Sequence, residues 1–95
     1  MISMKKTLLI VEPDEDIRQK LAVDLSDLTQ MLVIKAKDGL QAYQKTRNQP
    51  FDIILTEYNT SKLNGAELIS SIRETEHNPN TPFIIYTEDI DLAKT

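Results

Sequence analysis

The sequence has 95 residues, a net charge of −4 at pH 7, 40% hydrophobic residues and 27% charged residues. This length suits one small domain, and the composition is too apolar for a disordered chain. Only Lys5 and Lys6 are adjacent basic residues, so no basic surface for nucleic acid or an anionic membrane is expected. The absence of cysteine excludes disulfides and thiolate chemistry, and it fits the reducing cytoplasm.

The first apolar run, residues 8–11, predicts a strand that ends at Glu12. This run is too short for a signal peptide or a membrane span. After Pro13, Asp14 is expected to cap a helix. One face of that helix would carry four apolar residues at three- to four-residue spacing, namely Ile17, Leu21, Leu25 and Leu28.

The middle of the chain repeats this alternation of strand and helix. Residues 31–34 predict a second strand, and the turn pair Asp38-Gly39 leads into a short helix over 40–48 that Pro50 ends. The run 51–57 is nearly continuous in apolar residues, which predicts a strand buried on both faces. Glu57 closes this run, so an ionisable group stands where the buried strand ends.

The last third predicts one more helix and one more strand. A polar loop leads to Gly65, and Leu68, Ile69 and Ile72 supply a helical face. Gly39 and Gly65 are expected to provide backbone freedom at their turns. Residues 78–82 break the chain before a fourth strand at 83–86, and a further helix is expected to begin near residue 90.

Alternating strands and helices predict an α/β fold with right-handed crossovers and a parallel sheet. Ligands of such sheets bind at the carboxyl ends of the strands. Three predicted strands end there in a carboxylate or a hydroxyl, at Glu12, Glu57 and Thr87. These three side chains are therefore expected to cluster in one site.

Four spaced motifs resemble the receiver domain of response regulators in two-component signalling: LLIVEPDEDIR at 8–18, DG at 38–39, FDIILTEYNTSKLNG at 51–65 and PFIIYTED at 82–89. The resemblance implies a flavodoxin-like, three-layer sandwich with a parallel sheet of order 2-1-3-4. It covers residues 1–95 as one receiver-like domain. Members of this family continue through a fourth helix, a fifth strand and a fifth helix, so the resemblance implies a domain that is incomplete at its C-terminus.

The resemblance also assigns roles to residues. Glu57 falls where the family has the aspartate that accepts a phosphoryl group, and Thr87 falls on its switch hydroxyl. Glu12 and Pro13 fall on its paired acids that hold Mg²⁺. The lysine and the aromatic switch residue of the family's fifth strand have no counterpart in this sequence.

Two of these positions depart from the family pattern in ways that affect its chemistry. Glutamate extends the carboxylate by one bond of about 1.5 Å, and a displacement of about 1 Å can cost a hundredfold in the rate of transfer. Pro13 removes a side-chain oxygen, and Asp14 as a helix cap would face the amides. No cofactor is therefore expected to be required, and Glu12, Asp14 and Glu57 would form at best a weak Mg²⁺ site.

These departures favour a pseudo-receiver, a signalling module in which Glu57 partly imitates the phosphorylated state and Thr87 hydrogen-bonds to it. Such a module would not be an enzyme. Its partners would be a signalling protein or an output domain, or a second copy in a homodimer that covers the apolar edge of the fourth strand. Neither nucleic acid nor a membrane is an expected direct partner.

The alternative is a working phosphoacceptor that uses Mg²⁺ and a histidine-kinase donor, with Glu57 or the less favourably placed Asp52 accepting the phosphoryl group. An unrelated flavodoxin-like binding domain is disfavoured because cofactor-binding loops are absent. Simpler readings remain open for single residues. Glu57 could be a solvated acid, Glu12 could belong to an acidic helix start, and Thr87 could simply finish a strand. His77, alone in a loop, is assigned no role.

Overall fold

The computed structural model describes residues 5–87 of the chain. Within this range the chain alternates strands and helices in the order β1 (Thr7–Val11), α1 (Glu15–Thr29), β2 (Leu32–Ala36), α2 (Gly39–Asn48), β3 (Ile53–Glu57), α3 (Gly65–Arg73) and β4 (Phe83–Tyr86). The four strands are parallel and follow the order β2-β1-β3-β4. The predicted fold class and strand order are confirmed. The helix expected near residue 90 lies outside the described residues.

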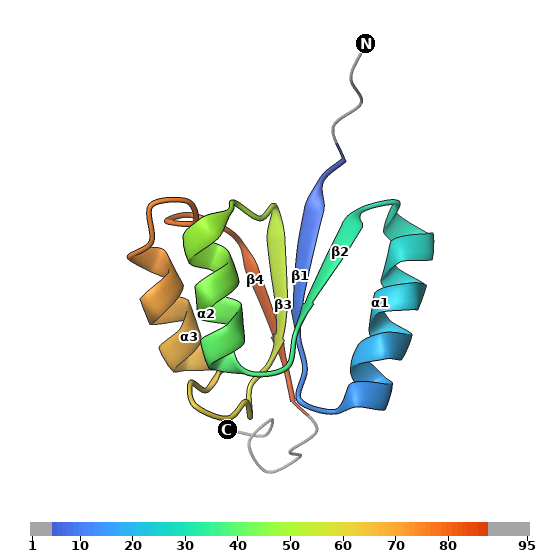
Figure 1. Cartoon of the computed structure of the whole chain (residues 1–95), viewed down its shortest axis with the longest axis horizontal. Coiled ribbons are helices and arrows are strands. Elements are labelled where there is room, and N and C mark those ends of the chain that lie inside the picture. The colour runs from blue at the N-terminus through green and yellow to red at the C-terminus, as the bar shows by residue number, and fades with distance from the viewer. Residues whose placement is uncertain (1–4, 88–95) are drawn as a thin grey trace.

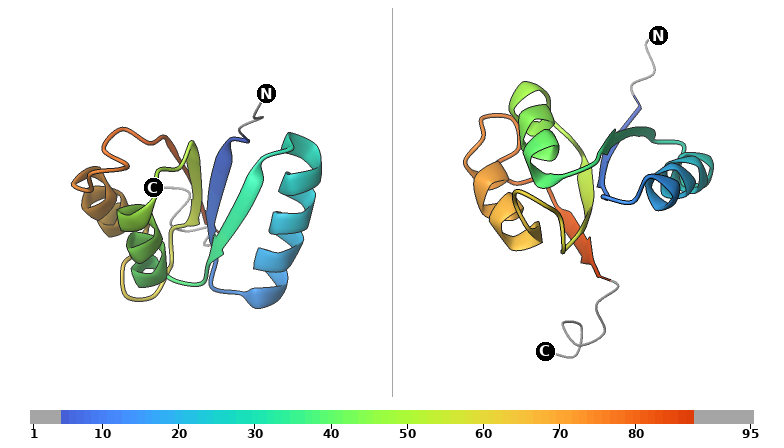
Figure 2. Two further views of the ribbon diagram at one scale, coloured as in Figure 1. Left: turned by 45° about the horizontal axis from the view of Figure 1, so that its top comes forward. Right: turned by 60° about the horizontal axis from the view of Figure 1, so that its bottom comes forward.

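The fold has three layers, with α1 on one side of the sheet and α2 and α3 on the other (Figure 1). The turned views in Figure 2 keep this separation of the helices. Each crossover returns the chain to a parallel strand, so the carboxyl ends of all the described strands lie at one end of the sheet. None of the helices within residues 5–87 has the length and apolar character that crossing a bilayer requires.

Each helix begins directly after a polar side chain that caps it. Asp14, Asp38 and Asn64 each accept a hydrogen bond of 2.8–3.0 Å from a backbone N–H in the first helical turn. Glu67 returns the bond to the backbone N–H of Asn64, which completes a capping box at α3. The predicted capping role of Asp14 is confirmed. These caps fix where each loop at the carboxyl end of the sheet joins its helix.

The hydrophobic core lies between the sheet and the pair α2 and α3. Its buried side chains come from three strands, from two helices and from the residue pair before β3. They are Leu9, Val11, Ala36, Ala42, Phe51, Ile54, Leu68 and Ile72. The opposite face of the sheet carries only α1 among the described helices, and no residue of α1 is fully buried. This face is therefore the less covered of the two.

Two expectations about burial are wrong, and both concern the side of the sheet that α1 covers. Leu28, expected on the apolar face of α1, is 80% exposed. β3 was expected to be buried on both faces, but Ile53 and Leu55 are only half-buried. The strand alternates faces, so these two side chains point to the α1 side, where α1 packs mainly on β1 and β2.

The glycines serve a different purpose from the one expected. Neither Gly39 nor Gly65 has a positive φ, so neither is needed for a left-handed turn. At Gly39, a Cβ atom would lie 2.4 Å from the carbonyl oxygen of Leu63. The absence of a side chain therefore lets the loop before α3 pack directly against the start of α2.

Candidate functional site

A small pocket lies at the carboxyl ends of β1 and β3. It has a volume of about 220 Å³ and is lined by Glu12, Pro13, Asp14, Ile17, Glu57 and Asn59. This volume is below the range of about 300–1,000 Å³ that is typical of sites for drug-sized ligands. The pocket has room for a hydrated ion or a phosphoryl-sized group, and three of its six lining residues are acids.

Glu57 is the last residue of β3 and lines this pocket. Only 6% of the residue is exposed, and its Oε1 accepts a hydrogen bond of 3.1 Å from the backbone N–H of Asn59. A buried acid with a fixed donor is not a freely solvated one. The simpler reading of Glu57 as a solvated acid is therefore wrong.

Glu12 follows β1 and is equally buried, with 4% of the residue exposed. Its Oε2 accepts a hydrogen bond of 2.8 Å from the backbone N–H of Asp14. Its Oε1 accepts a hydrogen bond of 2.6 Å from the hydroxyl of Tyr86, the last residue of β4. Both oxygens of this carboxylate thus have a donor from the protein itself. Tyr86 is a site residue that was not predicted from the sequence.

The register of the sheet explains how Tyr86 reaches this site. Tyr86 pairs with Glu57 between β4 and β3, and Thr56 pairs with Val11, the residue before Glu12. The carboxyl ends of the three strands are therefore level with one another. The signal was present in the sequence, because aligning the parallel strands by their apolar runs puts Tyr86 beside Glu57.

Thr87 lies just after β4 and is half-buried. Its hydroxyl accepts a long hydrogen bond of 3.5 Å from Nδ2 of Asn59. The same Asn59 donates its backbone N–H to Glu57. Asn59 thus connects the strand-end acid to Thr87, and it is a second residue of the site that the sequence analysis did not identify.

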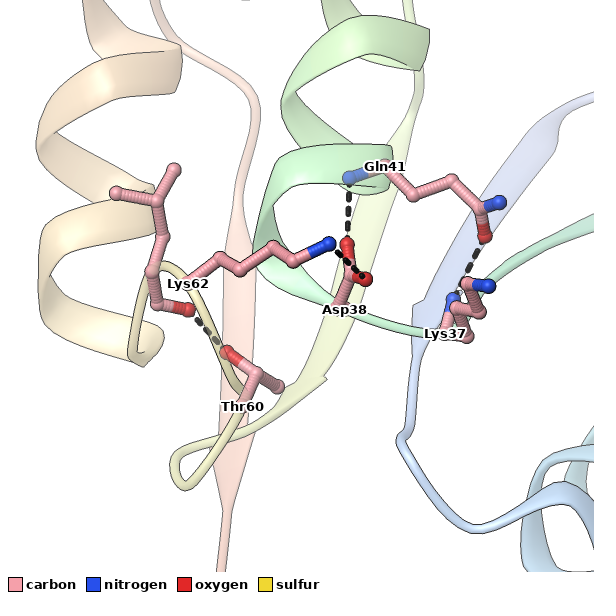
Figure 3. Close-up of polar contacts among 6 residues, drawn as sticks. Lys37, Asp38, Gln41, Thr60 and Lys62 are labelled. Atoms are coloured by element: carbon pink, nitrogen blue, oxygen red, sulfur yellow. Dashed lines mark hydrogen bonds and ion pairs between the residues drawn. The ribbon is translucent and has the colours of Figure 1, made fainter.

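The loop from β3 to α3 is tied to the start of α2 (Figure 3). Asp38 accepts a hydrogen bond of 2.8 Å from the backbone N–H of Gln41 with Oδ1, and its Oδ2 lies 3.6 Å from Nζ of Lys62. Thr60 donates its hydroxyl to the carbonyl oxygen of Leu63 within the loop. These contacts hold the loop that carries Asn59 without any ligand.

Some of the oxygens expected to hold Mg²⁺ are missing or already accept a hydrogen bond. Asp14 uses its Oδ1 to cap α1, Pro13 offers no side-chain oxygen, and Arg18 occupies the carbonyl oxygen of Glu12 at 2.8 Å. Within residues 5–87, no group of three or more histidine, cysteine, aspartate or glutamate side chains is placed to hold a metal ion. Mg²⁺ requires near-octahedral oxygen ligands at short distances. The expected grouping of Glu12, Asp14 and Glu57 lines one pocket without forming that geometry.

Two other polar residues lie away from the pocket. Asp52 stands before β3, at the opposite end of the strand, and accepts a hydrogen bond of 2.7 Å from the backbone N–H of Thr7. His77 is exposed in the loop between α3 and β4. Neither residue lines the pocket with Glu57.

A parallel sheet of order 2-1-3-4 with helices on both faces is the arrangement of flavodoxin-like α/β domains. The model of the response regulator receiver domain matches residues 8–95. The chain therefore belongs to the receiver domain family of two-component signalling.

Curated relatives agree with this family. The chain is 26% identical over 83 residues to a chemotaxis protein CheY homolog of Campylobacter jejuni, a match that covers 86% of this chain and 64% of that protein. It is 29% identical over 90 residues to the hybrid signal transduction histidine kinase D of Dictyostelium discoideum, covering 95% of this chain and 6% of the kinase. The chain thus spans less than two thirds of each of these relatives.

Solved structures support the same fold. The chemotaxis response regulator CheY4 of Vibrio cholerae has a TM-score of 0.84 and 26% identity, over 97% of this chain and 76% of that one. The receiver domain of a sensor histidine kinase from Pseudomonas aeruginosa has a TM-score of 0.78 and 26% identity, over 90% of this chain and 70% of that one. The second structure holds a magnesium ion in its active-site cleft.

Proposed function

We propose that this chain is a pseudo-receiver, a signalling module that acts through protein–protein contacts and is not switched by phosphorylation of a carboxylate. Glu57 stands at the phosphoacceptor position and Thr87 at the switch position. The observation that carries this proposal is the chain of hydrogen bonds from Glu57 through Asn59 to Thr87. An acid already connected to the switch residue needs no added phosphoryl group to make that connection.

The position of the Glu57 carboxylate supports this proposal. It lies about 1.5 Å further along its side chain than an aspartate carboxylate would, and it accepts a hydrogen bond within the loop. Phosphoryl transfer depends almost entirely on in-line placement of the nucleophile and on a cation that neutralises charge. We propose that both conditions are poorly met here, and that Mg²⁺ is at most a weak ligand.

Intact-mass measurement after incubation with acetyl phosphate and Mg²⁺ tests the proposal. We expect no adduct of one phosphoryl group on the wild-type chain. A stable adduct that disappears in Glu57→Gln and persists in Asp52→Asn would contradict it. That result would establish the alternative function, a working phosphoacceptor with Glu57 as the nucleophile.

Two observations favour this alternative enough to keep it. Glu12 and Glu57 line one open pocket, as acids of a receiver site would, and the similar Pseudomonas aeruginosa receiver holds magnesium in its cleft. In this alternative a histidine kinase would be the donor. The intact-mass experiment separates the two functions directly.

We further propose that β4 is the surface through which the module meets its partner, either another signalling protein, an output domain or a second copy of the chain. β4 is the edge strand of the sheet that residues 5–87 form. Two of its apolar side chains, Ile84 and Ile85, are 52% and 43% exposed. Exposed apolar residues on an edge strand favour association.

Light scattering over a dilution series tests whether the partner is a second copy. We expect an average mass above 10.9 kDa at high concentration that falls on dilution. Ile84→Lys should weaken this association, whereas Leu28→Lys, at the more exposed C-terminal end of α1, should not. A concentration-independent monomer with cooperative unfolding would exclude the homodimer.

A further inference from the structure

The hydroxyl of Tyr86 bonds to a buried carboxylate of the candidate site, and neither the family pattern nor the proposed function assigns it a role. Its partner is Oε1 of Glu12, at 2.6 Å. Glu12 is 4% exposed, so its charge has little contact with solvent. A buried carboxylate needs donors or a cation to offset the loss of hydration.

The donors that Glu12 has come from two different elements. Asp14 supplies a backbone N–H from the start of α1, and Tyr86 supplies its phenol from the end of β4. β3 lies between β1 and β4, and neighbouring strands are roughly 4.8 Å apart. The phenol must therefore reach across the end of β3, next to the position of Glu57.

We propose that Tyr86 takes the place of a cation at Glu12, and that its hydroxyl lowers the affinity of the pocket for divalent cations. A hydrogen bond between a phenol and a carboxylate is short and assisted by charge. It offsets part of the negative charge of Glu12 without a metal ion. A cation that binds Glu12 has to displace this hydroxyl or share the carboxylate with it.

The same bond links the end of β4 to the start of α1. Tyr86 directly precedes Thr87, and Glu12 directly precedes the loop that Asp14 caps. Tyr86 is therefore a positioning residue that acts through Glu12. The inference deepens the proposed function because it concerns the same pocket, but cation binding and phosphorylation are measured separately. A wild-type chain that accepts a phosphoryl group would overturn the proposed function and leave the role of Tyr86 standing.

Titration with Mn²⁺, followed through the electron paramagnetic resonance signal of the free ion, tests the inference. Mn²⁺ shares the preference of Mg²⁺ for oxygen ligands. Tyr86→Phe removes the hydroxyl that donates to Oε1 of Glu12, and this buried oxygen then lacks a hydrogen-bond donor. We therefore expect Mn²⁺ to bind to Tyr86→Phe about tenfold more tightly than to wild type. Tyr43→Phe is the matched control, because Tyr43 packs against the core from α2. It should bind Mn²⁺ as wild type does.

An affinity of Tyr86→Phe that equals that of wild type would overturn the inference, as would an equal gain in Tyr43→Phe. If Tyr86→Phe does not fold, the double variant Tyr86→Phe with Glu12→Gln decides the matter, because it also removes the charge. Folding of the double variant alone would show that the hydroxyl offsets the charge of Glu12. Failure of both variants to fold would show that the hydroxyl is needed for the fold itself, which overturns the inference.

Discussion

Two buried polar clusters lie at opposite ends of the same sheet, and they differ in charge and in access to solvent. At the amino ends of β3 and β4, Asn78 is fully buried. Its Oδ1 accepts a hydrogen bond of 2.8 Å from the backbone N–H of Phe51, and its Nδ2 donates to the carbonyl oxygens of Thr46 and Gln49 at 2.7 and 2.9 Å. This neutral amide joins the end of α2 to the entry of β3.

At the carboxyl ends of the strands, Glu12 and Glu57 are almost as buried but carry charge and line an open pocket. Hydrogen bonding does not distinguish the two clusters, because no buried side-chain nitrogen or oxygen within residues 5–87 lacks a partner. The two clusters differ in the charge of their side chains and in whether they line a pocket. A closed neutral cluster has a structural role, whereas acids around a pocket are candidates for function.

The largest effect is expected from Asn78→Ala, which leaves the backbone groups of Phe51, Thr46 and Gln49 without their buried partner. Each unsatisfied buried group costs about 1–3 kcal/mol, so we expect a loss of at least about 3 kcal/mol in the free energy of unfolding. Urea denaturation measures this loss. Asn80→Ala, at an exposed position of the same loop, should change stability by about 0.5 kcal/mol or less.

This pair of variants also tests the division of roles. If Asn78 is purely structural, folded Asn78→Ala should bind Mn²⁺ as wild type does, since the pocket is at the other end of the sheet. Equal losses in Asn78→Ala and Asn80→Ala would show that the cluster contributes little. A changed Mn²⁺ affinity in Asn78→Ala would show that the two ends of the sheet are coupled.

The fold and the position of Glu57 at a strand end could be predicted because they depend on short-range patterns. Each apolar run predicted a strand, Asp14 predicted the start of α1, and the parallel pairing of the strands brought their carboxyl ends together. Glu57 was found because it stands directly at the end of such a run. The family motifs added the strand order, which local patterns alone leave open.

The missed features depend on contacts between distant parts of the chain. Tyr86 bonds to Glu12 across a separation of 74 residues, and only the register between strands, not the apolar run that contains Tyr86, indicates this contact. Asn78 stands before a proline and was interpreted only as part of a chain break, although its side chain closes a buried network. Gly39 was expected to supply a turn, but a glycine is required there because any side chain would clash with Leu63.

The smaller effect is expected at the pocket, from the double variant Pro13→Asp with Glu57→Asp. It restores a side-chain oxygen at residue 13 and withdraws the carboxylate at residue 57 by one bond, so the oxygens approach the arrangement that Mg²⁺ prefers. We expect Mg²⁺ to bind about tenfold more tightly than to wild type, which corresponds to about 1.4 kcal/mol. Isothermal titration calorimetry measures this gain.

Glu57→Asp alone is the matched control, because it shortens the acid without adding a ligand and should account for only part of the gain. The arrangement of the strands should persist in both variants, since residues 13 and 57 lie at the pocket and not in the core cluster. An unchanged affinity in the double variant would mean that the missing oxygen does not limit cation binding. The hydrogen bond from Tyr86 to Glu12 would then be the stronger barrier, and adding Tyr86→Phe to the double variant should restore the binding.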